Sequence, residues 1–179
     1  MKKILMLLCV LFVICGCSAK PDLSYEVNSY PVDMSGYDGV TSVGHNFVGV
    51  EVDEVFRAIQ EKGSAVFYLG FKGCEHCQKA VKHLNKVAQE LGVTVCYIDA
   101  KSETHPVTNE DLDDLTIALY DVLNRDEYGE KALYTPHVFS IINGKIAGSY
   151  ISMKETGDEA KDGENIEKIY RKILEPFAQ

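Results

Sequence analysis

Two cysteines, Cys74 and Cys77, lie three positions apart in the segment FKGCEHCQK at residues 71–79. An apolar run of β-forming residues precedes them and apolar side chains at helical spacing follow them, so the pair lies where a strand gives way to a helix. The free backbone N–H groups and the positive dipole end of a helix favour a thiolate at Cys74. Cys77, one turn inside the helix, is predicted to be less exposed and to resolve a mixed disulfide formed by Cys74. The spacing therefore predicts thiol–disulfide exchange.

Charged neighbours should tune this pair. A cation at His76 would favour the thiolate, and Lys72 adds a second positive charge nearby. The like charge of Glu75 opposes both, unless Glu75 serves as a remote proton acceptor. The alternative for His76 is a surface residue without a role in the chemistry.

A different interpretation makes the cysteine pair half of a structural zinc site, which needs four ligands. The sequence offers no second C-x-x-C and no H-x₃-H for the other half. We therefore expect a redox pair with no metal and no cofactor. Cys96 lies on a core strand and is interpreted as a buried, inert thiol, and His105 and His137 are interpreted as local structure.

The first residues have the pattern of an export signal. Lys2 and Lys3 precede an apolar stretch at residues 4–14, which is too short for a membrane span. The following Ile14-Cys15-Gly16-Cys17 resembles a bacterial lipobox, which predicts a signal peptide at 1–16 and a lipidated N-terminus at Cys17. The alternative is an ordinary signal cleaved nearby, with Cys17 left as a free thiol.

Length and charge limit the remaining choices. Removing residues 1–16 would leave 163 residues, which suits one domain, and would change the net charge from −9 to −11. So acidic a chain is a poor partner for nucleic acid or for anionic lipid. Membrane attachment would therefore depend on the lipid at Cys17, on the extracytoplasmic face of the bacterial cell membrane.

The chain after the signal is predicted to begin with a tether at residues 17–45, which has no sustained period. A domain at 46–179 should follow with alternating strands and helices. Its first part comprises a strand at 46–50, a helix from Asp53 to about Lys62 capped by Asp53 and ended by Gly63, a strand at 64–71, a helix at 77–91 ended by Gly92, and a strand at 93–98.

The second part of the domain begins with a helix at 108–124, for which Thr108 and Asp111 have the spacing of a capping box. Asn143-Gly144 predicts a hairpin between antiparallel strands at 137–142 and 145–152. The charged stretch 154–163 is expected to be a loop, and a closing helix should run from Glu164 to Pro176.

This arrangement resembles the thioredoxin fold over residues 46–177, an α/β fold with a central mixed β-sheet flanked by helices. Three features carry the resemblance: the C-x-x-C at a strand-to-helix junction, Thr135-Pro136 where the family has a cis-proline facing the dithiol, and the hairpin that follows. The family relation implies a catalytic set of Cys74, Cys77, His76 and Pro136, and substrate contacts at Gly73, Thr135 and Pro136. The alternative for Pro136 is an ordinary proline at the start of a strand.

The chain also departs from the thioredoxin pattern. Gly73 and Tyr68 replace a tryptophan and a buried aspartate that are usual in thioredoxins. The dipeptide Glu75-His76 replaces Gly-Pro, and a histidine just before the second cysteine resembles the oxidising members and the isomerases. The helix at 108–124 is an extra helical segment before the proline, which makes it a candidate for part of a partner-binding face. The lipobox makes the chain similar to membrane-anchored thioredoxin-like lipoproteins and, more loosely, to bacteriocin-transport accessory proteins.

Two functions agree with these features. The first is a lipid-anchored, extracytoplasmic thiol–disulfide oxidoreductase that acts on thiols or disulfides of exported proteins or peptides, with a membrane redox partner as a further candidate. The second is a non-catalytic accessory module that docks an exported peptide or a transport protein. The intact Cys74–Cys77 pair favours the first.

Overall fold

Five strands form one mixed sheet in a computed structural model that describes residues 20–125, 128–151 and 156–178. The predicted signal peptide and Cys17 lie outside these residues. The strands, in chain order, are β1 (Phe47–Gly49), β2 (Ala65–Gly70), β3 (Val95–Asp99), β4 (His137–Ile142) and β5 (Lys145–Ile151). Their order across the sheet is β1-β3-β2-β4-β5. Strands β1, β3 and β2 are parallel, whereas β4 is antiparallel to both β2 and β5. The predicted mixed α/β sheet of the thioredoxin type is confirmed.

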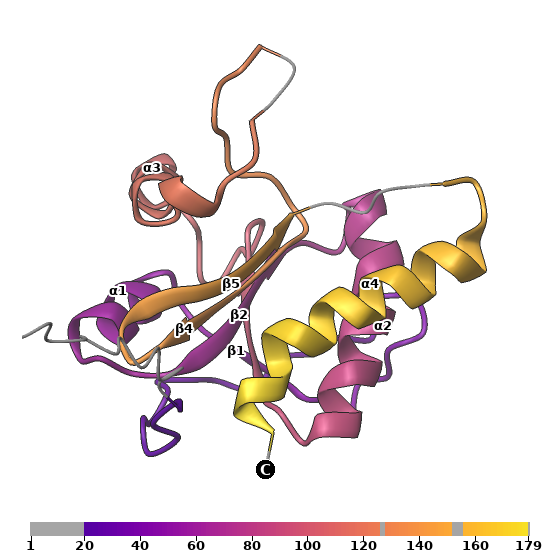
Figure 1. Cartoon of the computed structure of the whole chain (residues 1–179), viewed down its shortest axis with the longest axis horizontal. Coiled ribbons are helices and arrows are strands. Elements are labelled where there is room, and N and C mark those ends of the chain that lie inside the picture. Colours follow the sequence, from indigo (N-terminus) through magenta and orange to yellow (C-terminus); the bar gives the residue numbers. More distant parts are fainter. Residues whose placement is uncertain (1–19, 126–127, 152–155, 179) are drawn as a thin grey trace, which may run out of the picture.

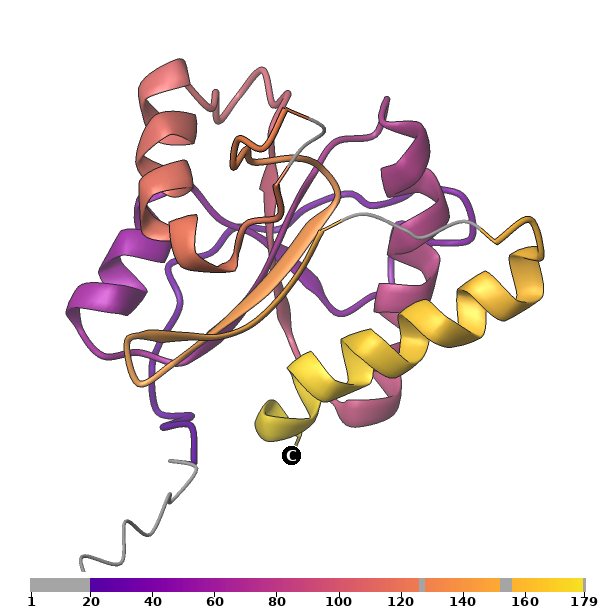
Figure 2. The same cartoon turned by 45° about the horizontal axis from the view of Figure 1, so that its top comes forward.

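Helices cover both faces of this sheet (Figures 1 and 2). One face carries α2 (Glu75–Leu91) and α4 (Glu159–Leu174), and the other carries α1 (Asp53–Gln60) and α3 (Asn109–Ala118). Short 3₁₀ turns follow α3 at Tyr120–Val122 and α4 at Glu175–Phe177. Within the described residues, none of these helices has the length and apolar character of a membrane span.

Helix α2 forms where the sequence predicts it because its apolar side chains recur every three or four residues. The buried set lies on one side of the helix and consists of Cys77, Ala80, Val81, Leu84, Val87 and Ala88 together with Asn85. Gly92 ends the helix in the left-handed conformation, with φ 66°. The buried side of α2 fixes the helix against the sheet, and thereby fixes the position of its first turn.

The prediction that residues 17–45 form a tether is wrong for the described residues, 20–45, which pack on the domain. Met34 and Tyr37 are 0% and 1% exposed and belong to the same core cluster as Cys77. Tyr30 pairs with Gly49 at the outer edge of β1 through two backbone hydrogen bonds of 2.9 and 2.8 Å. A Cβ on Gly49 would lie 2.1 Å from the Tyr30 ring, so the close approach requires glycine. The folded unit therefore begins well before residue 46.

Several helix ends differ from the predictions. Helix α1 has Val52 rather than Asp53 as its N-cap and ends at Gln60, and α3 ends at Ala118, where a 3₁₀ turn continues the chain. The capping box of α3 is confirmed, with Thr108 and Asp111 bonding each other's backbone N–H. Helix α4 begins at Glu159, inside the expected loop.

The early start of α4 has a local and a tertiary cause. The Asp158 side chain accepts a hydrogen bond from the Lys161 N–H and so caps the helix. Gly163, within the first turns, leaves room for the His83 ring of α2, which a Cβ there would approach to 2.6 Å. Packing against α2 therefore outweighs the poor helix propensity of glycine.

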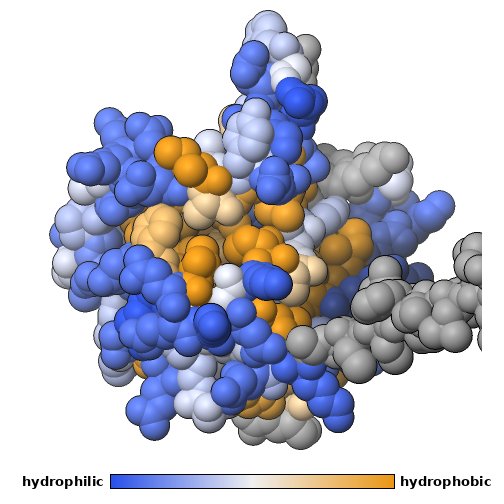
Figure 3. Space-filling view, turned by 60° about the vertical axis from the view of Figure 1, so that its left-hand side comes forward, coloured by the Kyte–Doolittle hydropathy of each residue, from blue (hydrophilic) through white to orange (hydrophobic). Residues whose placement is uncertain are grey.

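The face that carries α1 and α3 leaves some apolar side chains partly exposed. Apolar side chains gather in the middle of this side of the molecule, bordered by polar ones (Figure 3). The second core cluster lies beneath α1 and α3, and several of the side chains that pack against it are only partly buried, among them Phe56, Ile59, Val122, Leu133 and Ile146.

Candidate active site

Cys74 is the N-cap residue of α2, and Cys77 lies in the first turn of the same helix. Their sulfurs form a disulfide, with the Cα atoms 5.1 Å apart. Cys77 is fully buried, whereas Cys74 is partly exposed, as the sequence predicts. The Cys77 N–H donates a hydrogen bond of 3.2 Å to the Cys74 Sγ atom. The sulfur thus takes the acceptor role that a serine or aspartate oxygen has at other helix starts.

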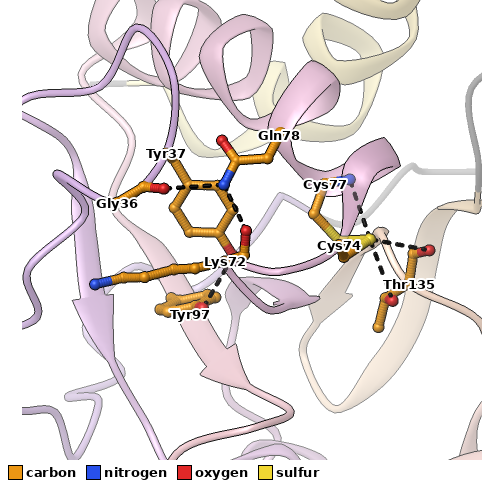
Figure 4. Close-up of a disulfide and its surroundings, with 8 residues drawn as sticks. All are labelled: Gly36, Tyr37, Lys72, Cys74, Cys77, Gln78, Tyr97 and Thr135. Atoms are coloured by element: carbon orange, nitrogen blue, oxygen red, sulfur yellow. Dashed lines mark hydrogen bonds between the residues drawn. A yellow bond between two sulfur atoms is a disulfide. The ribbon is translucent and has the colours of Figure 1, made fainter.

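The predicted cis peptide bond is present between Thr135 and Pro136, and this turn lies directly against Cys74 (Figure 4). The Thr135 hydroxyl lies 3.7 Å from the Cys74 Sγ atom and can donate a hydrogen bond to it. The Thr135 carbonyl oxygen is 3.8 Å from the same sulfur. That oxygen can accept a hydrogen bond only from a protonated thiol, since a disulfide sulfur carries no hydrogen. Pro136 is buried, and Gly73 on the other side of Cys74 is exposed.

The charged side chains around the disulfide agree only in part with the prediction that His76 and Lys72 favour the Cys74 thiolate and that Glu75 opposes it. Glu75 forms an ion pair with Lys79, with 3.0 Å between the Oε1 and Nζ atoms. The hydrogen bond and charge of Lys79, and to a smaller extent the charge of His76, lower the pKa of Glu75. The Lys72 side chain points away from the disulfide (Figure 4) and lies against Gly36. The nearby positive charge predicted for Lys72 is therefore directed elsewhere, whereas His76 is exposed beside the pair.

Tyr68 occupies the position six residues before Cys74 and is fully buried in the core cluster that contains Cys77. Its ring stacks on Tyr97, with 5.5 Å between the ring centroids. Burial raises the pKa of the Tyr68 hydroxyl well above its ordinary value. Tyr68 is therefore neutral at physiological pH and is a poor proton acceptor for the buried thiol.

Sequence reasoning missed two residues near the pair. Tyr37 comes from the predicted tether, yet its hydroxyl lies 3.0 Å from that of Tyr97. Gln78 follows Cys77 and bonds backbone groups of residues 36, 38 and 72. No pattern in the sequence marks these contacts, because their partners lie far away in the chain or are backbone atoms.

In the described part of the chain, the third cysteine, Cys96, and the histidines His105 and His137 have structural roles. Cys96 is buried, and burial raises the pKa of its thiol, which agrees with an inert core residue. The His105 Nδ1 atom is 2.9 Å from Glu51. His137 is fully buried, with its Nε2 atom 2.8 Å from the Ser149 hydroxyl. No three histidine, cysteine or acidic side chains in the described part of the chain lie close enough to hold a metal ion.

Comparisons with known proteins find similarity to solved structures but none to a family model or a curated protein. No protein-family model matches the sequence, and no curated protein matches it. Thioredoxin from Trypanosoma brucei brucei aligns at 15% identity with a TM-score of 0.45, covering 76% of this chain and 98% of that one. Thioredoxin O2 from Arabidopsis thaliana in the oxidized state aligns at 14% identity with a TM-score of 0.41, covering 70% and 96%. A further structure described as having a thioredoxin fold aligns at 13% identity with a TM-score of 0.46, covering 66% and 94%.

Proposed function

We propose that this protein is a thiol–disulfide oxidoreductase whose reacting groups are Cys74 and Cys77. One observation carries the proposal: a partly exposed sulfur at a helix N-terminus is bonded to a fully buried one, beside a cis-proline turn. An exposed thiolate is the nucleophile in exchange, and a shielded second thiol resolves the intermediate. A module used only for docking has no need of this asymmetric pair.

The reaction follows from the two positions. In the reduced protein the Cys74 thiolate attacks a substrate disulfide, forms a bond to one substrate sulfur and releases the other as a thiolate. The Cys77 thiolate then attacks the Cys74 sulfur and releases the second substrate thiol. Two electrons pass from the dithiol to the substrate, and the Cys74–Cys77 disulfide remains. The reverse sequence donates a disulfide.

Several residues would assist thiol–disulfide exchange without forming or breaking covalent bonds themselves. The helix N-terminus and the Cys77 N–H stabilise a thiolate at Cys74, and a protonated His76 adds to this effect. Pro136 carries no N–H, which would leave the neighbouring backbone free to pair with a substrate strand. Gly73 and Thr135 flank the exposed sulfur and would contact the substrate.

The substrates would be exported proteins or peptides. Four large apolar side chains are exposed along the chain from α3 to the cis-proline: Ile117, Tyr120, Tyr128 and Tyr134. Exposed apolar groups of this kind suit contact with a partly unfolded polypeptide. The extra helical segment would thus serve as part of a partner-binding face.

The place of action would be the extracytoplasmic face of the bacterial cell membrane, with the protein held by lipid on Cys17. The export signal and the lipobox in the sequence support this proposal. A Cys17→Ser variant, or inhibition of lipoprotein processing, should release the protein from membranes or leave an unprocessed precursor. Unchanged mass and fractionation in both cases would contradict it.

The direction of electron flow is expected to favour disulfide donation or shuffling. Helix dipole and His76 stabilise the thiolate, and Lys79 offsets the opposing charge of Glu75. The reduction potential should therefore lie above about −270 mV, the value for thioredoxin, and below about −120 mV, the value for a strongly oxidising periplasmic enzyme. A potential as low as that of thioredoxin would instead indicate a reductase supplied by a membrane redox partner.

Trapping of mixed disulfides tests the proposed reaction. Cys77→Ser should accumulate covalent adducts with a disulfide-containing peptide through Cys74, because no second thiol resolves them. Cys74→Ser should not, since its remaining thiol is buried. Adducts would be counted by mass spectrometry without reductant. Equal trapping by both variants would refute the assigned roles, and peptide binding with no exchange in the wild type would favour the docking module.

A further inference from the structure

The side-chain amide of Gln78 joins three parts of the chain next to the disulfide (Figure 4). Its Nε2 atom donates hydrogen bonds to the carbonyl oxygens of Gly36, at 2.9 Å, and Lys72, at 2.5 Å. Its Oε1 atom accepts a bond of 2.8 Å from the Asp38 N–H. One amide thus connects the helix that carries Cys77, the loop that leads to Cys74, and a segment some forty residues earlier in the chain.

The early segment is a firm support for this contact. Tyr37, between the two residues that bond Gln78, is 1% exposed, and its hydroxyl lies 3.0 Å from that of Tyr97. The Lys72 side chain lies across Gly36, where a Cβ would come within 2.5 Å of the Lys72 Cδ atom. Residues 36–38 are therefore held by the core, and through Gln78 they hold the loop before Cys74.

We propose that Gln78 is a positioning residue for the dithiol. This inference rests on the proposed function, because it concerns how readily the Cys74–Cys77 disulfide forms. Oxidation of the pair removes two protons and two electrons and forms one S–S bond. Its equilibrium depends on the effective concentration of one thiol at the other, which is high only while the loop holds Cys74 close to Cys77.

Loss of the Gln78 bonds would let the loop sample positions in which the two sulfurs do not meet. Such positions are open to the dithiol and closed to the disulfide, so the dithiol gains stability and the couple becomes more oxidising. The expected direction is thus a higher reduction potential, and the reacting atoms themselves are unchanged.

The experiment replaces Gln78 with methionine, which keeps a similar volume and makes none of the three bonds. Full-length wild type and Gln78→Met are equilibrated in glutathione redox buffers, and the oxidised fraction is measured by thiol alkylation and mass spectrometry. We expect the equilibrium constant for oxidation by glutathione disulfide to fall about three- to tenfold in the variant, where tenfold corresponds to about 30 mV.

Gln89 supplies a matched control. Its Nε2 atom also donates to a backbone carbonyl of the N-terminal segment, that of Gly44, but from the far end of α2. Gln89→Met therefore removes the same kind of contact away from the dithiol and should leave the potential unchanged. Thermal unfolding of both variants would show any general loosening.

The outcomes separate this inference from the proposed function. A wild-type potential in Gln78→Met, a lower potential, or equal shifts in Gln78→Met and Gln89→Met would each overturn the positioning role while leaving the exchange reaction intact. A wild-type pair that does not equilibrate reversibly with glutathione would overturn the proposed function, and this inference with it.

Discussion

A sulfur atom and a helix start stabilise each other at Cys74. The Cys77 N–H would otherwise lack a partner in the helix, and it bonds the Cys74 Sγ atom. Such a bond is stronger to a charged acceptor than to a neutral one. The same contact therefore caps α2 and favours the thiolate that the proposed reaction needs.

His137, next to the cis-proline, is a residue whose burial has a measurable consequence. Burial lowers the pKa of its imidazole from 6.5 to about 4. The unfolded chain then binds more protons than the folded one between these values, so the free energy of unfolding should fall as pH decreases from 6.5 to 4, by up to about 3 kcal/mol. Urea unfolding at several pH values would measure this slope.

A substitution isolates the contribution of this histidine. His137→Gln removes the titrating group and should flatten the slope over that interval, even if it lowers stability at neutral pH. An unchanged slope in His137→Gln would assign the pH dependence to other groups.

At the scale of elements, the β4–β5 turn is fixed both by its own residues and by what it contacts. Asn143 and Gly144 have φ values of 51° and 77°, as a two-residue hairpin turn requires. The Gly144 N–H also donates to the Gly63 carbonyl oxygen at 2.9 Å, which docks the turn beside the end of α1. A Cβ on Gly144 would lie 2.6 Å from the Ile59 carbonyl oxygen.

Because both its backbone conformation and its contact with α1 fix this turn, alanine should lower the free energy of unfolding more at Gly144 than at Gly92. Gly92→Ala, at the C-cap of α2, places a side chain at φ 66° with open space around it and should cost about 1 kcal/mol. Gly144→Ala adds a backbone collision and should cost roughly 1–3 kcal/mol more. Denaturant unfolding would compare the two, and equal losses would show that the turn moves away from α1 without cost.

At the scale of the whole molecule, the N-terminal segment is part of the folded unit. Its side chains fill the core beside α2, and its backbone covers the free edge of β1. The lipid anchor proposed at Cys17 would thus lie only a few residues before chain that contacts the domain, because the Lys20 carbonyl and the Asp22 N–H already bond the Asn143 side chain.

Stability measurements can test this integration. Met34 is 0% exposed, so Met34→Ala should lower the free energy of unfolding by about 2–5 kcal/mol. Val43, in the same segment but 76% exposed, should change stability by less than about 0.5 kcal/mol. Similar small effects at both positions would restore the tether interpretation.

The sequence by itself determined the features that depend on neighbours in the chain. The position of Cys74 at a helix start follows from the apolar period of α2, the capping box of α3 from Thr108 and Asp111, and the hairpin from Asn143-Gly144. These signals are strong because the interacting groups are at most four residues apart.

Only the tertiary structure decided which distant segments support the site. Tyr37 lies in a stretch without period, and the Gln78 amide bonds backbone groups that any sequence would offer, so neither leaves a local signal. Lys72 is near Cys74 in sequence, yet packing on Gly36 turns its charge away. Helix α4 likewise includes Gly163 because the His83 ring needs the space. In each case a contact across the fold outweighs local preference, since burial and long-range hydrogen bonds are formed only when the whole chain is in place.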